Sequence, residues 1–275
     1  MINVELKGGA VKEFENGTTP AEIAKSIGAG LYKSVCCAKV DGDLCDLRTP
    51  LEKDCKVELL TFDNVDGQKT FWHTASHVLA QAVKRLYPNA KCAIGPAVDN
   101  GFYYDFDVEK PFSPEDLEKI KAEMKKIVKS GLELERVELS PEEAEKKLEE
   151  MNEPYKVELV KEHSDKGEHI TFYKQGEFID LCAGPHLMSV APIKAIELTA
   201  CTGAYWRGDA NNAQLCRVYG VAFPKASMLE EHLKKLEEAK LRDHNKLGRE
   251  LEYFTTVDYL SLIHISEPTR RSYIS

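Results

Sequence analysis

The sequence has no hydrophobic run that approaches the ~20 apolar residues needed to cross a membrane. Its first residues, MINVELKGG, also lack the apolar core of a signal peptide. Internal repeats and low-complexity tracts are missing as well. These absences exclude a membrane-spanning class and lead us to expect a cytoplasmic protein.

Positive charge is scarce, because 37 Lys and Arg face 46 Asp and Glu for a formal net charge of −9. Binding of nucleic acid through bulk positive charge is therefore excluded, and any such contact must use local patches. The eight cysteines have irregular gaps and include the adjacent Cys36 and Cys37, a poor geometry for a disulfide. Without a secretion signal, we interpret them as reduced cytosolic thiols.

With 275 residues, of which 43% are apolar, the chain is long enough for two or three globular domains. Residues 1–63 predict a first domain whose elements follow in the order strand, strand, helix, strand, strand. The helix begins at a cap on Thr19 and ends in a turn at 28–30. This order is typical of a β-grasp, ubiquitin-like sheet with one helix across it.

Residues 64–224 predict a second domain of α+β class that opens with a helix at 70–86. Two charged helices follow between 113 and 153, each with a capping signal. Residues 225–249 predict a long amphipathic linker helix. The expected short strands of the second domain are 101–106, 155–160, 171–174 and 178–182.

A histidine pair lies on the helix that opens the second domain, in the motif HTASH that starts at His73. The four-residue spacing to His77 puts both imidazoles on one side of the helix, about 40° apart around its axis. A single histidine is most often a satisfied core or surface residue, but a pair at this spacing indicates a metal or catalytic site.

The second chemical motif is DLCAGPH, which starts at Asp180. Asp180 and Cys182 share one face of the predicted strand at 178–182. Gly184 and Pro185 end the regular structure, so we expect His186 on a turn beside Cys182. A strand face covered by helices would normally be apolar, and this combination therefore favours a functional role.

These residues leave two chemistries open. Soft thiolate and imidazole donors in a tetrahedral array first suggest zinc. The other possibility is a metal-free hydrolytic site, in which histidine, Lys156 and Asp180 position and activate a water molecule. Lys156 falls on the predicted strand at 155–160, where an exposed strand lysine is the simpler interpretation. The zinc donors would be His73, His77, Cys182 and His186.

Five longer stretches strengthen the functional interpretation: HTASHVLAQAV, AIGPAVDNGFYYDF, PYKVELV, DLCAGPHL and TGAYWRGDANNAQLCRVYG. Together they resemble the N-terminal half of bacterial threonyl-tRNA synthetase, from about residue 1 to about residue 256. The resemblance implies a TGS domain at 1–63, an editing domain shared with alanyl-tRNA synthetase at 64–224, and the linker helix at 225–249. Residues 250–275 would then begin a truncated catalytic domain and end in a non-native tail.

The resemblance also implies an activity, the hydrolysis of the ester that joins serine to the 3′ end of threonine tRNA. The corresponding four side chains hold zinc in alanyl relatives, whereas the resemblance implies a metal-free site here. We expect a histidine with a pKa near neutrality to orient the water, and Lys156 to stabilise the oxyanion. The implied catalytic residues are His73, His77, Lys156, Asp180, Cys182 and His186.

Further residues are implied around this site. Gly95, Pro96 and Tyr104 line the pocket by resemblance, while Arg207, Arg217 and Lys225 are candidates for contacts to the tRNA backbone.

The full-length family uses ATP, magnesium and a catalytic-domain zinc, and it forms a homodimer. Nothing in the sequence corresponds to the class II catalytic domain or the anticodon-binding domain, so we expect neither a cofactor nor aminoacylation. Three alternatives stay open: a free-standing deacylase that acts in trans, a tRNA-binding module with an inactive pocket, and a zinc hydrolase unrelated to tRNA.

Overall fold

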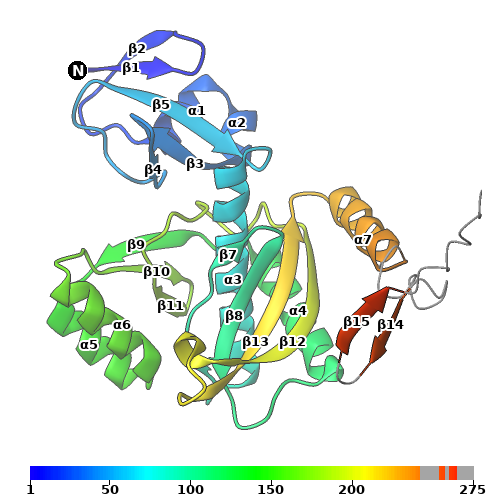
Figure 1. Cartoon of the computed structure of the whole chain (residues 1–275). Coiled ribbons are helices and arrows are strands. Elements are labelled where there is room, and N and C mark those ends of the chain that lie inside the picture. Colours follow the sequence, from blue (N-terminus) through cyan, green and yellow to red (C-terminus); the bar gives the residue numbers. More distant parts are fainter. Residues whose placement is uncertain (242–253, 258–259, 265–275) are drawn as a thin grey trace, which may run out of the picture. The chain divides into compact units, whose positions relative to one another are not determined.

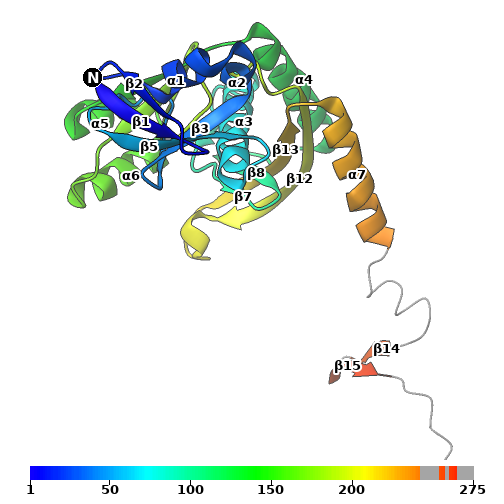
Figure 2. The same ribbon diagram turned by 90° about the horizontal axis from the view of Figure 1, so that it is seen from above.

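The computed structural model describes residues 1–241, 254–257 and 260–264 of the chain. It divides into two units, Met1–Leu229 and Glu230–Ser275, which are described separately. The first unit holds a small amino-terminal domain and a larger mixed domain (Figures 1 and 2). The predicted fold class, a β-grasp domain followed by an α+β domain, is confirmed.

The amino-terminal domain is a five-stranded sheet in the order β2-β1-β5-β3-β4, in which β1 pairs with β5 in parallel. Ile2 and Val4 of β1 are buried while Asn3 and Glu5 are exposed, as expected for a strand with one covered face. The elements are β1 (Ile2–Leu6), β2 (Val11–Phe14), α1 (Pro20–Ile27), α2 (Ala29–Ser34), β3 (Val35–Val40), β4 (Asp43–Cys45) and β5 (Cys55–Thr61).

Helix α1 begins with the predicted cap, because the Thr19 side chain accepts a hydrogen bond from the Glu22 N–H and the Glu22 carboxylate accepts one from the Thr19 N–H. The predicted turn at 28–30 is only partly right. Gly28 ends α1, but the chain enters the short helix α2 at once.

The second domain is built around α3 (Val65–Leu86), which begins before the predicted start at Thr70. The helix packs against α4 (Pro114–Ser130) and against one face of the sheet β12-β13-β8-β6 (Figure 1). Residues Val78, Leu79 and Phe102 belong to the core between them. The strands are β6 (Lys91–Cys92), β7 (Ala97–Val98), β8 (Gly101–Asp107), β12 (Ala195–Tyr205) and β13 (Gln214–Phe223).

A smaller sheet, in the order β11-β10-β9, carries the second chemical motif. Two helices, α5 (Pro141–Glu150) and α6 (Pro154–Asp165), pack together beside it (Figure 1). The predicted strand at 155–160 is wrong, because these residues form α6. The strands are β9 (Leu134–Glu138), β10 (Thr171–Gln175) and β11 (Phe178–Leu181).

The physical reason for that error lies in the apolar spacing of the segment. Tyr155, Val157 and Leu159 alternate with polar residues, as in a strand. Pro154, however, occupies the first helical turn, and the buried residues are Lys156 and Val160, which are one helical turn apart.

The predicted linker helix is present as α7 (Ala226–Leu241), and the rest of that prediction lies outside the described residues. In the second unit, β14 (Phe254–Val257) and β15 (Leu260–His264) form an antiparallel pair. The predicted non-native tail falls largely outside the described residues. Among the described residues, no helix is long and apolar enough to cross a membrane.

Candidate functional site

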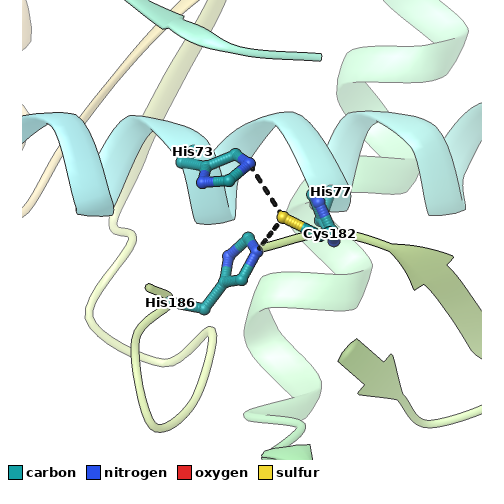
Figure 3. A group of neighbouring side chains, drawn as sticks. All are labelled: His73, His77, Cys182 and His186. Carbon is teal, nitrogen blue, oxygen red and sulfur yellow. Dashed lines mark hydrogen bonds between the residues drawn. The ribbon is translucent and has the colours of Figure 1, made fainter. Parts of the chain in front are cut away.

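Helix α3 presents both predicted histidines on one side, facing the end of β11 (Figure 3). The ring centroids of His73 and His77 are 5.4 Å apart. The helix is buried on nearly every side, and His77 is only 2% exposed. The four-residue spacing therefore does what the sequence predicted, and it places two imidazoles in a water-poor environment.

The β11 end and the turn that follows supply the opposing groups. Cys182 Sγ lies 3.2 Å from His73 Nε2 and 3.2 Å from His186 Nε2 (Figure 3). A Cβ on Gly184 would come within 2.3 Å of Tyr173 Oη, so only glycine fits at this position, where φ is +74°. The tight turn is what returns His186 to Cys182.

The orientation of His186 follows from its hydrogen-bonding partners. Thr74 Oγ1 donates to the Thr70 carbonyl and lies 3.2 Å from His186 Nδ1, so we assign the ring proton to Nδ1. Nε2 then directs a lone pair toward Cys182. Thr74 lies inside the HTASH motif but was not singled out from the sequence.

The donor atoms of the His/Cys cluster all lie within 4.8 Å of one another. Nδ1 of His77 is buried without a hydrogen-bond partner among the described residues. This orphaned atom and the soft N and S donors fit a zinc ion chemically. The cluster comprises His73, His77, Cys182 and His186.

A buried ion pair lies beside this His/Cys cluster. Lys156 Nζ, from α6, is 2.9 Å from Asp180 Oδ1, and both side chains are almost fully buried. The other carboxylate oxygen accepts a 2.6 Å hydrogen bond from the Tyr104 hydroxyl and lies 3.7 Å from His77 Nε2. The interpretation of Lys156 as an exposed strand lysine is therefore wrong.

Burial controls the protonation of the His/Cys cluster. It lowers the pKa of His73 to about 3, assisted by neighbouring His77, and the pKa of His77 to about 4. It also lowers the pKa of His186 well below its usual range and raises that of the Cys182 thiol to about 12. Burial thus shifts the pKa of both α3 histidines away from neutrality, although His73 and His77 both line the cavity and His73 is only half-buried.

In the Lys156–Asp180 ion pair, the interactions that favour the charged forms outweigh the effect of burial. Burial alone would lower the pKa of Lys156, but the adjacent Asp180 charge and their hydrogen bond raise it. Burial likewise opposes ionisation of Asp180, yet the Lys156 charge holds the pKa of that carboxyl below its usual range. The site therefore combines an uncharged His/Cys cluster with one buried, charged pair.

A cavity of about 350 Å³ opens beside these groups. Gly95 and Pro96 line it, whereas Tyr104 lies beneath Gly95, where an added Cβ would come within 2.1 Å of the Tyr104 Cδ2. Ser76 Oγ donates to the Gly95 carbonyl and so ties this loop to α3. His163 of α6 lines the cavity as well, and nothing in its sequence context pointed to it.

The three basic residues suggested for tRNA contacts have varied surroundings. Arg207 pairs with two α6 carboxylates, those of Glu158 and Glu162. Arg217 makes a bidentate pair with Asp105 at 2.7 and 2.8 Å. Lys225 is exposed just before α7. Two of the three side chains are thus engaged by carboxylates, and their role toward tRNA stays a prediction.

Comparisons with known proteins agree with this architecture. Residues 2–61 match the family model of the TGS domain. Residues 170–219, which include β10, β11 and the His186 turn, match the second additional domain of threonyl and alanyl tRNA synthetases. Two separate segments of the chain thus match domain models, and the second model is of a domain of aminoacyl-tRNA synthetases.

Individual relatives show which synthetases the chain is similar to. The chain is 57% identical to a threonine–tRNA ligase of Acetivibrio thermocellus over 254 residues, which is 92% of this chain and 40% of the ligase. It is 58% identical to the Clostridium tetani ligase over 93% of the chain and 40% of the relative. The chain is therefore homologous to threonine–tRNA ligases over about two-fifths of their length, in the part that holds these two domains.

Proposed function

We propose that this chain hydrolyses the ester of serine attached to threonine tRNA, a proofreading reaction. The observation that carries the proposal is the convergence of a neutral His/Cys cluster and a buried lysine–aspartate pair beside one small cavity. Its volume of about 350 Å³ is near the lower end of ligand pockets, which suits a small aminoacyl group.

The physical need for such a site can be stated independently. Serine lacks only the methyl group of threonine, and a missing methylene gives roughly 1–3 kcal/mol of discrimination. A pocket that accepts threonine must also accept serine at a frequency too high for translation. A second pocket that hydrolyses the serine ester and excludes the methyl group of threonine by collision solves this problem.

The low pKa values define how the histidines act. Neutral imidazoles with a pKa of about 3 or 4 are weak bases, so they orient a water molecule through hydrogen bonds and do not remove its proton fully before attack. Lys156 lines the cavity and stabilises the oxyanion that forms on the ester carbonyl. Asp180 holds the Lys156 ammonium group in place.

The site works, in our proposal, without a metal ion. This choice follows the resemblance to bacterial threonyl enzymes, and the ammonium group of Lys156 beside the cluster can supply positive charge there without a metal ion. If zinc is bound, the His/Cys cluster would hold it, and the ion would supply a water molecule of lowered pKa. Metal analysis of the purified protein, together with deacylation after chelator treatment, tests this choice.

The partner that we propose is serine-charged threonine tRNA, and with it a cytoplasmic location. The net charge of −9, together with the engagement of Arg207 and Arg217 by carboxylates, predicts weak and salt-sensitive binding by this chain. High tRNA concentrations and low salt are therefore the appropriate assay conditions.

The proposal is tested by single-turnover deacylation of Ser-tRNA and Thr-tRNA by the purified chain. We expect release of serine but little release of threonine. Cys182→Ala and His73→Ala should each lower the rate by about a hundredfold or more. Cys55→Ala, which removes a thiol of β5, is the matched control and should leave the rate unchanged. Full activity in both site variants would refute the site, and an inactive wild-type chain that still binds tRNA would favour the binding-module alternative.

A further inference from the structure

The TGS domain extends one turn into the surroundings of the candidate site. Asp46, Leu47 and Arg48 form this turn directly after β4, and the Asp46 side chain accepts a hydrogen bond from the Arg48 N–H. Leu47 is fully buried in the TGS core, and its carbonyl accepts from the Ala21 N–H of α1. The turn is thus fixed within its own domain while its polar side chains point out of it.

Arg48 binds the backbone that carries His186. Its guanidinium donates to the carbonyls of Leu187 at 2.7 Å, His186 at 3.4 Å and Leu134 at 3.0 Å. A planar group with several fixed donors is suited to hold three carbonyls in one arrangement, and a lysine ammonium cannot reproduce this fork.

Asp46, which forms a 3.0 Å ion pair with Arg48, binds the same segment. Its Oδ2 accepts a hydrogen bond from the His186 N–H at 3.3 Å and one from the Tyr173 hydroxyl at 2.9 Å. The Tyr173 ring in turn lies against the His186 imidazole, with centroids 4.4 Å apart. Asp46 is only 7% exposed, so water does not compete strongly for these bonds.

An apolar contact also joins the His186 segment to the TGS domain. Met188, two residues after His186, packs against the hydrophobic core of the TGS domain. Its carbonyl accepts a hydrogen bond from the Leu134 N–H, at the start of β9. The segment 186–188 therefore lies between the Asp46–Arg48 turn, β9 and α3, with Thr74 accepting the Leu187 N–H.

We propose that Asp46 and Arg48 of the TGS domain are positioning residues for His186, so that the hydrolytic site of the second domain depends on the docked TGS domain. This inference rests on the proposed function. Neither residue touches the cavity, and both act through the backbone and the ring environment of His186. A change that displaces the Asp46–Arg48 turn would therefore also displace His186 within the site.

The chain offers a matched control at another point between the two domains. Lys39 of β3 pairs with Asp66 in the first turn of α3, with 2.6 Å between Nζ and Oδ2. This pair joins the domains but touches no residue of the His186 segment. If the readouts respond to any loss of contact between the domains, Lys39→Ala should change them too, by less than Arg48→Ala because the Lys39–Asp66 pair is partly exposed, whereas positioning predicts a change only in Arg48→Ala.

The experiment compares the full chain with its Arg48→Ala, Asp46→Ala and Lys39→Ala variants by hydrogen exchange and by deacylation of Ser-tRNA. In the first two variants we expect the exchange of the Gly184 amide and of amides 186–189 to rise about tenfold or more, because charge-assisted hydrogen bonds are lost. We expect kcat to fall by about ten- to a hundredfold with KM nearly unchanged, because displacement of His186 disturbs its 3.2 Å contact with Cys182, which lines the cavity, while the rest of the cavity lining is unchanged. Lys39→Ala should leave both readouts at their wild-type values.

The inference would be overturned by unchanged exchange and unchanged kcat in Arg48→Ala, or by changes of the same readouts in Lys39→Ala. Faster exchange with full deacylation would overturn it too, since His186 would then need no positioning. An inactive wild-type chain would refute the proposed function instead, and the exchange data would still decide whether the TGS turn holds the His186 segment.

Discussion

Replacement of Lys156 by methionine tests the energetics of the site most directly. The change keeps the length of the side chain and removes its charge, which leaves the Asp180 carboxylate almost fully buried without its cation. Removal of one partner from a buried ion pair typically costs about 3–5 kcal/mol in the free energy of unfolding. The Tyr104 hydroxyl remains a donor to Asp180, so we expect the lower half of that range, about 3 kcal/mol.

The second part of this test is the double variant Lys156→Met with Asp180→Asn. The amide can still accept the Tyr104 hydrogen bond and leaves no buried charge, so the double variant should be more stable than Lys156→Met alone by about 1–3 kcal/mol. Urea unfolding of the wild-type chain, Lys156→Met, Asp180→Asn and the double variant at pH 7, followed by circular dichroism, gives the coupling free energy. Additive effects of the two substitutions, or a loss below about 1 kcal/mol in Lys156→Met, would refute the picture of a charged buried pair.

Two further predictions concern stability. The α3 histidines His73 and His77 have a folded-state pKa of about 3 and about 4, whereas each has an ordinary pKa in the unfolded chain. Below pH ~6.5 the unfolded chain therefore binds more protons than the folded chain, and the free energy of unfolding falls as pH falls. The loss is about 1.4 kcal/mol per pH unit for each histidine until pH nears about 4. Urea titrations between pH 7 and pH 4.5 measure this slope, and a His77→Gln variant with an unchanged slope would contradict it. Gly95→Ala should push the Tyr104 ring aside and cost about 1–3 kcal/mol, whereas Gly30→Ala, which meets no atom within 4 Å, should not lower the melting temperature; equal melting of the two variants would contradict the clash.

The sequence predicted those parts of the site that local geometry controls. A helix period brings His73 and His77 to one face, and a strand period followed by Gly184 and Pro185 brings Cys182 and His186 together. Both periodicities depend on only a few neighbouring residues, so the side-chain directions that they predict also hold in the folded chain. The pairing of the two motifs across the cleft was inferred from the resemblance and the residue types, and the structure confirms that they meet.

The predictions that were wrong or missing concern contacts between residues far apart in the sequence. Lys156 was assigned to a strand because its neighbours alternate, and only tertiary packing shows that Lys156 and Val160 share the buried face of a helix. The contribution of Asp46 and Arg48 could not be predicted, since more than 130 residues separate them from the His186 segment. Long-range hydrogen bonds to backbone carbonyls leave no periodic pattern in a sequence.

The charges in the site also limit which side chain can stabilise the negative charge that ester hydrolysis would produce. The hydrolysis of an ester develops negative charge on the carbonyl oxygen, and the imidazoles remain neutral at pH 7, because their pKa values are about 4 or lower. Lys156 is the cation that directly contacts the Asp180 carboxylate at the cluster. If an imidazolium supplied the positive charge instead, the rate would rise as pH falls toward 4. If Lys156 supplies it, the rate should stay flat from pH 7 to about pH 5 and fall near pH 4, where His77 takes up a proton and no longer accepts a hydrogen bond from water. If the proposed function is right, the chemistry therefore divides between neutral imidazoles that place the water molecule and a charged Lys156 that stabilises the developing anion.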